Sequence, residues 1–170
     1  MSIKNTLILL LFAALAPLAG CGFVPMYGSG AGSTGVSAPQ GLDKVEIALI
    51  PDQSGVYLRN ILIDHFYQNG YPSAPTHILS VTRIQELKSD LDITVDSEAT
   101  RKQIKITGIL HLTDRATGQV VLSRELKAFT SYNVLGSQFT TRVSENDARE
   151  AALTDLARQI ETQTALYFKR

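Results

Sequence analysis

Residues 101–132, RKQIKITGILHLTDRATGQVVLSRELKAFTSY, decide how this chain folds. Residues 101–113 alternate apolar and polar side chains, which is typical of a strand with one buried face. Residues 119–132 alternate in the same way, and Asp114-Arg115-Ala116-Thr117-Gly118 between them is a turn signal. We therefore predict a β-hairpin whose inward side chains are Ile104, Ile106, Gly108, Leu110, Leu112, Val120, Leu122, Leu126, Ala128 and Tyr132.

The register of this hairpin depends on which residues pair next to the turn. If Leu112 pairs with Val120, the inward Arg124 lies opposite Gly108. The missing side chain of Gly108 would then leave room for the arginine stem to lie across the sheet.

The hairpin is preceded by a strand and a helix. Residues 44–50 alternate apolar and polar side chains and predict a half-buried strand. A helix follows, capped by Asp52 or Ser54 and running to about Asn69. His65 lies on its apolar face, where we expect a hydrogen-bonded histidine at the core edge rather than a metal ligand, since no second ligand is suitably spaced. The expected apolar stripe is Leu58, Ile61, Leu62, His65 and Phe66.

A second strand is predicted over residues 76–87. Ile84 is out of phase with Leu79 and Val81, and a β-bulge near Thr82-Arg83 would restore the phase. Residues 87–100 are rich in Asp and Ser, and we predict a solvated loop there. This stretch contains several carboxylates, but it lacks the glycine that a calcium-binding EF-hand loop requires.

The chain ends in a long predicted helix. Residues 133–143 form the connection, and Ser144-Glu145-Asn146-Asp147 resembles a capping box that starts a helix running to about Phe168. Its apolar stripe is Ala148, Ala152, Leu153, Leu156, Ala157, Ile160 and Tyr167.

The element order β-α-β-β-β-α predicts an α/β (α+β) domain, a two-layer sandwich. Two helices would pack on one face of a four-stranded mixed sheet, and the first strand, helix and strand would form a right-handed crossover. The other face would be polar and partly exposed, apart from Ile109, Val121 and Phe129.

The first 20 residues have the pattern of a secretory signal. Lys4 supplies the charge, residues 7–15 are apolar, and Leu18-Ala19-Gly20-Cys21 resembles a lipobox. Cys21 is the single cysteine, so an intrachain disulfide cannot account for it. We predict that Cys21 is lipid-modified; the alternative is an ordinary small residue after a plain signal peptide.

The domain boundaries follow from this pattern. Residues 1–20 are the expected signal peptide, residues 21–42 a lipidated cysteine with a flexible Gly/Ser-rich tether, and residues 43–170 one periplasmic domain. In bacterial lipoproteins an aspartate after the cysteine favours the inner membrane, so Gly22 favours the outer membrane, on the periplasmic face. Two or more acyl chains hold a protein on a bilayer essentially permanently.

The composition argues against several classes of function. Lysine plus arginine and aspartate plus glutamate each number 16, so no basic excess indicates nucleic acid. The three histidines, His65, His77 and His111, lie on different predicted elements, and no catalytic triad, metal cluster or phosphate loop is evident. We expect no enzyme, cofactor or metal. A periplasmic hydrolase and an auxiliary lipoprotein of another envelope transport system remain the alternatives.

Several short strings, spread over almost the whole mature chain, point to one family. They are Cys21-Gly22-Phe23 with Pro25 and Tyr27, Leu58-Arg59-Asn60, Ala99-Thr100-Arg101, Thr117-Gly118, Ser131-Tyr132-Asn133, and residues 145–168. With them the chain resembles the LptE family of lipopolysaccharide-assembly lipoproteins, especially its alphaproteobacterial forms. The resemblance implies that this protein is a non-enzymatic partner of the LptD β-barrel at the outer membrane. In that role the lipoprotein would sit inside the barrel as a plug and help the barrel to fold. The resemblance also makes lipopolysaccharide a candidate ligand.

Three cations are candidates for contact with lipopolysaccharide. The register above places Lys105 directly opposite Lys127 on the outer face, where like charges are mildly destabilising. Lipid A phosphates between the two ammonium groups would explain the pair, and Arg101 on the same face could join them. The alternative is that both lysines are solvated and screened, with Glu125 nearby.

Overall fold

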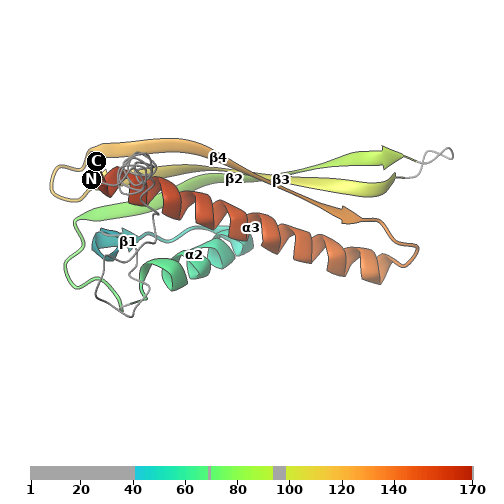
Figure 1. Cartoon of the computed structure of the whole chain (residues 1–170), viewed down its shortest axis with the longest axis horizontal. Coiled ribbons are helices and arrows are strands. Elements are labelled where there is room, and N and C mark those ends of the chain that lie inside the picture. Colours follow the sequence, from blue (N-terminus) through green and yellow to red (C-terminus); the bar gives the residue numbers. More distant parts are fainter. Residues whose placement is uncertain (1–40, 69, 94–98, 170) are drawn as a thin grey trace, which may run out of the picture. The chain divides into compact units, whose positions relative to one another are not determined.

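The computed structural model describes residues 41–68, 70–93 and 99–169 (Figure 1). The expected signal peptide, the expected lipidation site Cys21 and nearly all of the expected tether lie outside the described residues. Leu42, at the end of that tether, is fully buried in a 3-10 turn, so the folded part includes it.

The elements follow the predicted order and form two layers. The sheet has the order β1-β2-β3-β4; β1 runs parallel to β2, and the other neighbours are antiparallel. Both helices lie on one face of the sheet (Figure 1), which confirms the predicted two-layer fold. The bounds are β1 Val45–Ile47, α2 Asp52–Phe66, β2 His77–Ile93, β3 Ala99–Asp114, β4 Val120–Asn133 and α3 Gln138–Phe168.

The core lies between the helices and the inward side chains of the sheet. Nearly all predicted inward positions of β3 and β4 are buried, although Val120 is 57% exposed because it lies beside the turn. Ala152 and Ala157 are fully buried on α3, and their small side chains let this helix approach the sheet closely. The largest fully buried side chains are Leu42, Ile50, Leu58, Leu62, Leu79, Ile104, Ile106, Leu110, Leu112, Leu153, Leu156 and Ile160.

The predicted bulge in β2 is present. The pairing with β3 shifts between Thr82 and Gln85, and Arg83 has a φ of 56°. Val81 therefore faces the core before the bulge, and Glu86 lies opposite the buried Ile106 after it.

The polar stretch predicted as a loop is largely strand. β2 continues to Ile93 and β3 begins at Ala99, so only residues 94–98 lie between the two strands. Asp90 pairs with Lys102, and their side chains form an ion pair of 3.5 Å. Cross-strand pairing with opposite charges can support a strand whose composition alone favours a loop.

The last helix starts earlier than its sequence pattern predicts. α3 begins at Gln138, so Ser144 lies inside the helix and the expected capping box is wrong. The true start is held by Thr141, whose hydroxyl accepts a hydrogen bond from Leu135 N (2.9 Å) and donates one to Leu135 O (3.0 Å). Two contacts of the Thr141 hydroxyl thus hold the start of the helix in place of the capping box that was predicted at residues 144–147.

Candidate functional site

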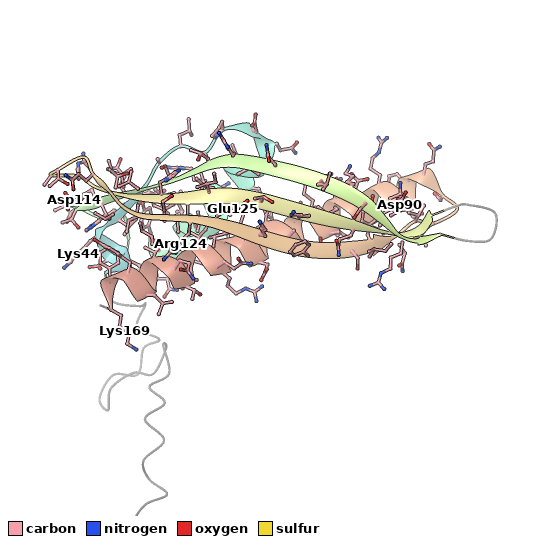
Figure 2. All side chains as sticks on the ribbon, turned by 90° about the horizontal axis from the view of Figure 1, so that it is seen from above. Lys44, Asp90, Asp114, Arg124, Glu125 and Lys169 are labelled. Atoms are coloured by element: carbon pink, nitrogen blue, oxygen red, sulfur yellow. The ribbon has the colours of Figure 1, made fainter. Side chains whose placement is uncertain are left out.

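One face of the sheet carries neither of the described helices. Figure 2 looks onto this face, with the helices behind it and with Asp90 and Asp114 towards its two ends. Leu87, Lys105 and Phe129 form one row across the three long strands, and Gln85, Thr107 and Lys127 form the next. Leu87 is 62% and Phe129 54% exposed. We call this surface the open sheet face.

The register of the β3–β4 hairpin corrects the predicted lysine pair. Leu112 pairs with Leu122, not with Val120, so Lys105 lies opposite Phe129 and Lys127 opposite Thr107. The pairing is irregular beside the turn, between Leu112 and Thr113.

The turn and the irregularity beside it together explain this register. The Asp114 carboxylate accepts hydrogen bonds from Ala116 N and Thr117 N, at 2.9 and 2.8 Å, and these hydrogen bonds lower the pKa of the carboxyl group. Gly118 has a φ of 70°, and Asp114 N donates to Gln119 O. Strand pairing therefore starts with Thr113 and Val120, and the irregularity adds one residue to β4, which brings Leu122 opposite Leu112.

The three candidate cations share the open sheet face, and each has a protein partner. Lys105 Nζ lies 6.0 Å from the centroid of the Phe129 ring, and Lys127 Nζ lies 3.4 Å from Glu125 Oε2. Arg101 Nη2 donates to Ser131 Oγ at 2.9 Å. Lys105 and Lys127 are diagonal neighbours, with Cβ atoms ~7–8 Å apart, so the direct repulsion that motivated the site is absent.

The predicted register placed the Arg124 stem in the space beside Gly108, and this prediction is wrong. Arg124 pairs with Leu110, while Gly108 pairs with Leu126. A Cβ atom on Gly108 would lie 3.3 Å from Val81 and 3.5 Å from Leu156, so apolar core atoms fill the space instead.

A charged cluster crosses the helix-bearing side of the sheet. Arg149 on α3 binds Glu86 on β2 through Nε–Oε2 and Nη2–Oε1 contacts of 2.6 and 3.1 Å, and binds Glu145 at 2.7 Å. Lys88 on β2 contacts both glutamates. Hydrogen bonds from Arg149 lower the pKa of Glu86, those from Lys88 lower that of Glu145, and Glu145 raises the pKa of Lys88. We call these four residues the ion-pair cluster.

One contact of the ion-pair cluster could have been predicted from the sequence. Glu145 and Arg149 have the i, i+4 spacing of a helical ion pair. The contacts with Glu86 and Lys88 could be predicted only by knowing the bulge in β2 and the early start of α3. The Tyr132 hydroxyl also donates to Glu145 at 3.3 Å, and burial together with that carboxylate raises the pKa of Tyr132.

The three histidines lie on three different elements and have different surroundings. His65 Nδ1 lies 2.9 Å from Oε2 of Glu161, a buried carboxylate on α3, so its predicted hydrogen-bonded role is confirmed. His77 packs edge-on against Tyr167 and Phe168. His111 Nδ1 is buried without a hydrogen-bond partner among the described residues. Within the described ranges, no group of three or more potential ligands could hold a metal ion.

The fold of this chain is similar to the folds of several bacterial lipoproteins. A candidate lipoprotein from Caulobacter crescentus CB15 has a TM-score of 0.61 at 19% identity, covering 78% of this chain and 95% of that one. Rare lipoprotein B from Shewanella oneidensis has a TM-score of 0.58 at 8% identity, covering 74% and 94%. A minor lipoprotein from Acinetobacter baumannii has a TM-score of 0.53 at 20% identity, covering 73% and 90%. At these identities the likeness defines the fold alone.

Residues 42–164 match the LptE family, described as lipopolysaccharide-assembly. The chain therefore belongs to the LptE family, as the resemblance of its short strings predicted. No curated protein matches it. Among the described helices, none has the length and apolar character needed to cross a bilayer.

Proposed function

We propose that this protein is a lipid-anchored, non-enzymatic component of lipopolysaccharide assembly that works as the partner of an LptD-type outer-membrane β-barrel. The match of residues 42–164 to the LptE family carries this proposal. The site geometry is compatible with it, because the open sheet face presents exposed side chains for binding.

The open sheet face is the contact surface in this proposal. It combines exposed apolar side chains, Leu87 and Phe129, with hydroxyl and amide groups and with the three candidate cations. A partly apolar face of this kind on a small domain is typical of an interface. The barrel would enclose this face, and the lipoprotein would act as a plug and as an aid to folding.

The test of the partnership is affinity purification of the tagged lipoprotein from native membranes. We expect a large barrel protein in one-to-one ratio, and we expect depletion of the lipoprotein to lower the amount of folded barrel. An inner-membrane complex in place of the barrel would favour the alternative of another envelope transport system. Unchanged barrel levels together with unchanged surface lipopolysaccharide would contradict the proposal.

Anchoring through Cys21 is the second part of the proposal. The lipobox at residues 18–21 supports it, and Gly22 supports the outer membrane as the destination. Replacing Cys21 by Ser should block lipid modification, alter processing and shift the protein away from the outer-membrane fraction. Unaltered processing and fractionation would contradict the anchor and the localisation.

Binding of lipopolysaccharide through Lys105, Lys127 and Arg101 is the third part. The three cations lie on the open sheet face, and phosphates could reach the two lysines along the diagonal between them. The double substitution Lys105→Glu with Lys127→Glu should weaken binding of lipopolysaccharide to the purified protein. It should lower the thermal midpoint only slightly, because it breaks one exposed ion pair and one exposed cation–π contact.

A matched control separates this site from a general effect of charge. Lys44→Glu with Lys169→Glu makes the same change of charge at exposed positions away from the open sheet face (Figure 2). Equal loss of binding in both double variants would show a non-specific attraction. Full binding by the Lys105 and Lys127 variant would remove the lysine site and leave the barrel partnership untouched.

A further inference from the structure

β1 lies at one end of the strand order, so its outer side borders no described strand. Ala48 N donates to Leu79 O at 2.9 Å on the side of this segment that faces β2. Alternate residues of a strand direct their backbone groups to opposite sides, so Val45 and Ile47 direct theirs outward, away from β2. A row of free outward groups on an edge strand is a template on which another strand can pair.

The outward groups of β1 already have partners within the chain. The Tyr67 hydroxyl accepts a hydrogen bond from Ile47 N at 2.9 Å and donates one to Val45 O at 3.2 Å. Val45 N donates to Leu42 O of the preceding 3-10 turn. A single phenol hydroxyl thus bonds the N–H and C=O groups that an added strand would use.

Arg59 on α2 covers the remaining carbonyl groups. Its Nη2 lies 3.5 Å from Ile47 O, and its Nε lies 3.3 Å from Ala48 O. Arg59 belongs to the string Leu58-Arg59-Asn60, which is one of those that carry the family resemblance. Leu58 is fully buried and fixes the turn of α2 from which Arg59 reaches β1.

Tyr67 is held in place for its two hydrogen bonds. Its ring lies against Tyr71, with ring centroids 4.8 Å apart, and its backbone N donates to Ile63 O at 2.9 Å where α2 ends. Burial raises the pKa of Tyr67 above the ordinary 10.0, so the hydroxyl keeps the proton that it donates. We call Tyr67 and Arg59 the edge clasp.

Two further stretches of sheet edge are also protected. Gln159 on α3 donates to Lys127 O of the other edge strand, β4, at 3.0 Å. Beyond β1, the edge of β2 carries Glu86 and Lys88, which belong to the ion-pair cluster. Charged side chains on an edge strand disfavour pairing with another strand. Protection at three separate places indicates that extension of the sheet is a hazard for this chain.

We propose that the edge clasp is a built-in block against strand addition, which keeps two copies of this chain from pairing through β1. A lipid anchor on the segment that precedes β1 would concentrate copies on one membrane face, where pairing through an open edge would be favoured. The inference goes beyond the barrel partnership and does not depend on it. Only the membrane setting rests on the proposed anchor.

The experiment measures self-association of the purified full-length protein by sedimentation velocity over a range of concentrations. Tyr67→Phe with Arg59→Ala removes the four side-chain contacts with β1. We expect this double variant to self-associate at least about tenfold more tightly than the unsubstituted protein, while circular dichroism shows that it stays folded. Tyr57→Phe with Arg158→Ala is the matched control, because it makes the same two chemical changes where the Tyr57 hydroxyl contacts Glu150 and no strand.

A destabilised variant separates the edge clasp from a general loss of stability. Leu156 is fully buried in the core, so Leu156→Ala destabilises the domain without opening β1. We expect folded Leu156→Ala to associate no more than the unsubstituted protein. If the clasp double variant unfolds, Tyr67→Phe and Arg59→Ala are each measured alone by the same criterion.

Hydrogen exchange locates the contact between copies. In the clasp variant, the backbone amides of residues 45–49 should gain protection as the concentration rises, and those of residues 120–126 should not. A folded clasp variant that stays monomeric would overturn the proposal. Equal association of the matched control or of Leu156→Ala, or protection gained away from β1, would overturn it too. Pairing through β1 in the unsubstituted protein would show that the clasp does not block the edge.

Discussion

Removing Arg149 should weaken the attachment of the first turns of α3 to β2. Its guanidinium makes two contacts with Glu86, of 2.6 and 3.1 Å, one of 2.7 Å with Glu145 and one of 2.7 Å with Asn146 Oδ1. Arg149→Ala deletes all four and leaves Lys88 as the single cation between two carboxylates.

The expected loss follows from geometry and exposure. The side chains of Arg149, Glu86 and Glu145 are 24%, 24% and 23% exposed, so the contacts lie between a solvated surface pair and a buried one. A surface pair contributes about 0–1 kcal/mol and a hydrogen bond to a charged group about 1.5–3 kcal/mol. About 1 kcal/mol for each glutamate gives a loss of about 2 kcal/mol in the free energy of unfolding. For a domain of this size, the thermal midpoint should fall by about 8 °C.

The pH dependence has a definite sign. The pKa values of Glu86 and Glu145 are lowered from the ordinary 4.5. Their contribution is therefore fully present above the unfolded-state pKa of 4.5 and is lost as the pH falls through the lower folded-state values. The difference in stability between the unsubstituted protein and Arg149→Ala should be largest near neutral pH and should shrink in this acidic window.

The assay is chemical denaturation followed by circular dichroism, from neutral pH downwards. Arg158→Ala is the control, because Arg158 is an exposed arginine on the same helix with no ion pair among the described residues. It should change the midpoint little. A loss in Arg149→Ala no larger than in Arg158→Ala, or a difference that persists unchanged in acid, would refute the reasoning.

Three further substitutions test the packing of the domain by thermal or chemical denaturation. Gly41→Ala should cost about 2–3 kcal/mol, because Gly41 has a φ of 97° and a new Cβ would lie 2.5 Å from Phe168; a neutral result would mean that the chain there can move away from α3. Leu156→Ala should cost about 3 kcal/mol, since Leu156 is fully buried, and a loss below about 1 kcal/mol would contradict a close-packed core. Tyr67→Phe should cost about 1 kcal/mol, since its hydroxyl accepts a bond of 2.9 Å from Ile47 N, and an unchanged midpoint would show that water replaces it.

The sequence by itself determined which side chains face the core. Alternation in residues 101–113 correctly assigned Ile104, Ile106, Leu110 and Leu112 to the buried face, and the alanine-rich stripe of α3 was equally clear. These patterns are local, because an element with one buried face must repeat its apolar residues with the period of its own backbone. The bulge near Thr82 was visible for the same reason, as a break in that period.

The functional candidates were less accessible to sequence reasoning. The lipobox-like pattern at residues 18–21 is local and can be read directly, although it lies outside the described residues. The helical position of the exposed Phe139 and Val143 was not predicted, because the expected helix began only at Ser144 and these residues were assigned to a connection. Without the length of α3 relative to α2, no pattern in the sequence distinguishes an exposed phenylalanine in a loop from one on a bare helical face.

Only the tertiary structure decided how the elements meet. The predicted β3–β4 register was wrong by two residues, and a slip of two leaves every side chain on its original face, so alternation cannot detect it. The turn around Asp114 and the irregularity beside Leu112 set the register, in which Lys105 and Lys127 are not directly opposite each other. The ion-pair cluster likewise joins residues some 60 positions apart, and it forms because side chains in the first half of α3 reach those of β2 near the N-terminus of α2. Long-range contacts of this kind depend on the packing of whole elements, which no local period records.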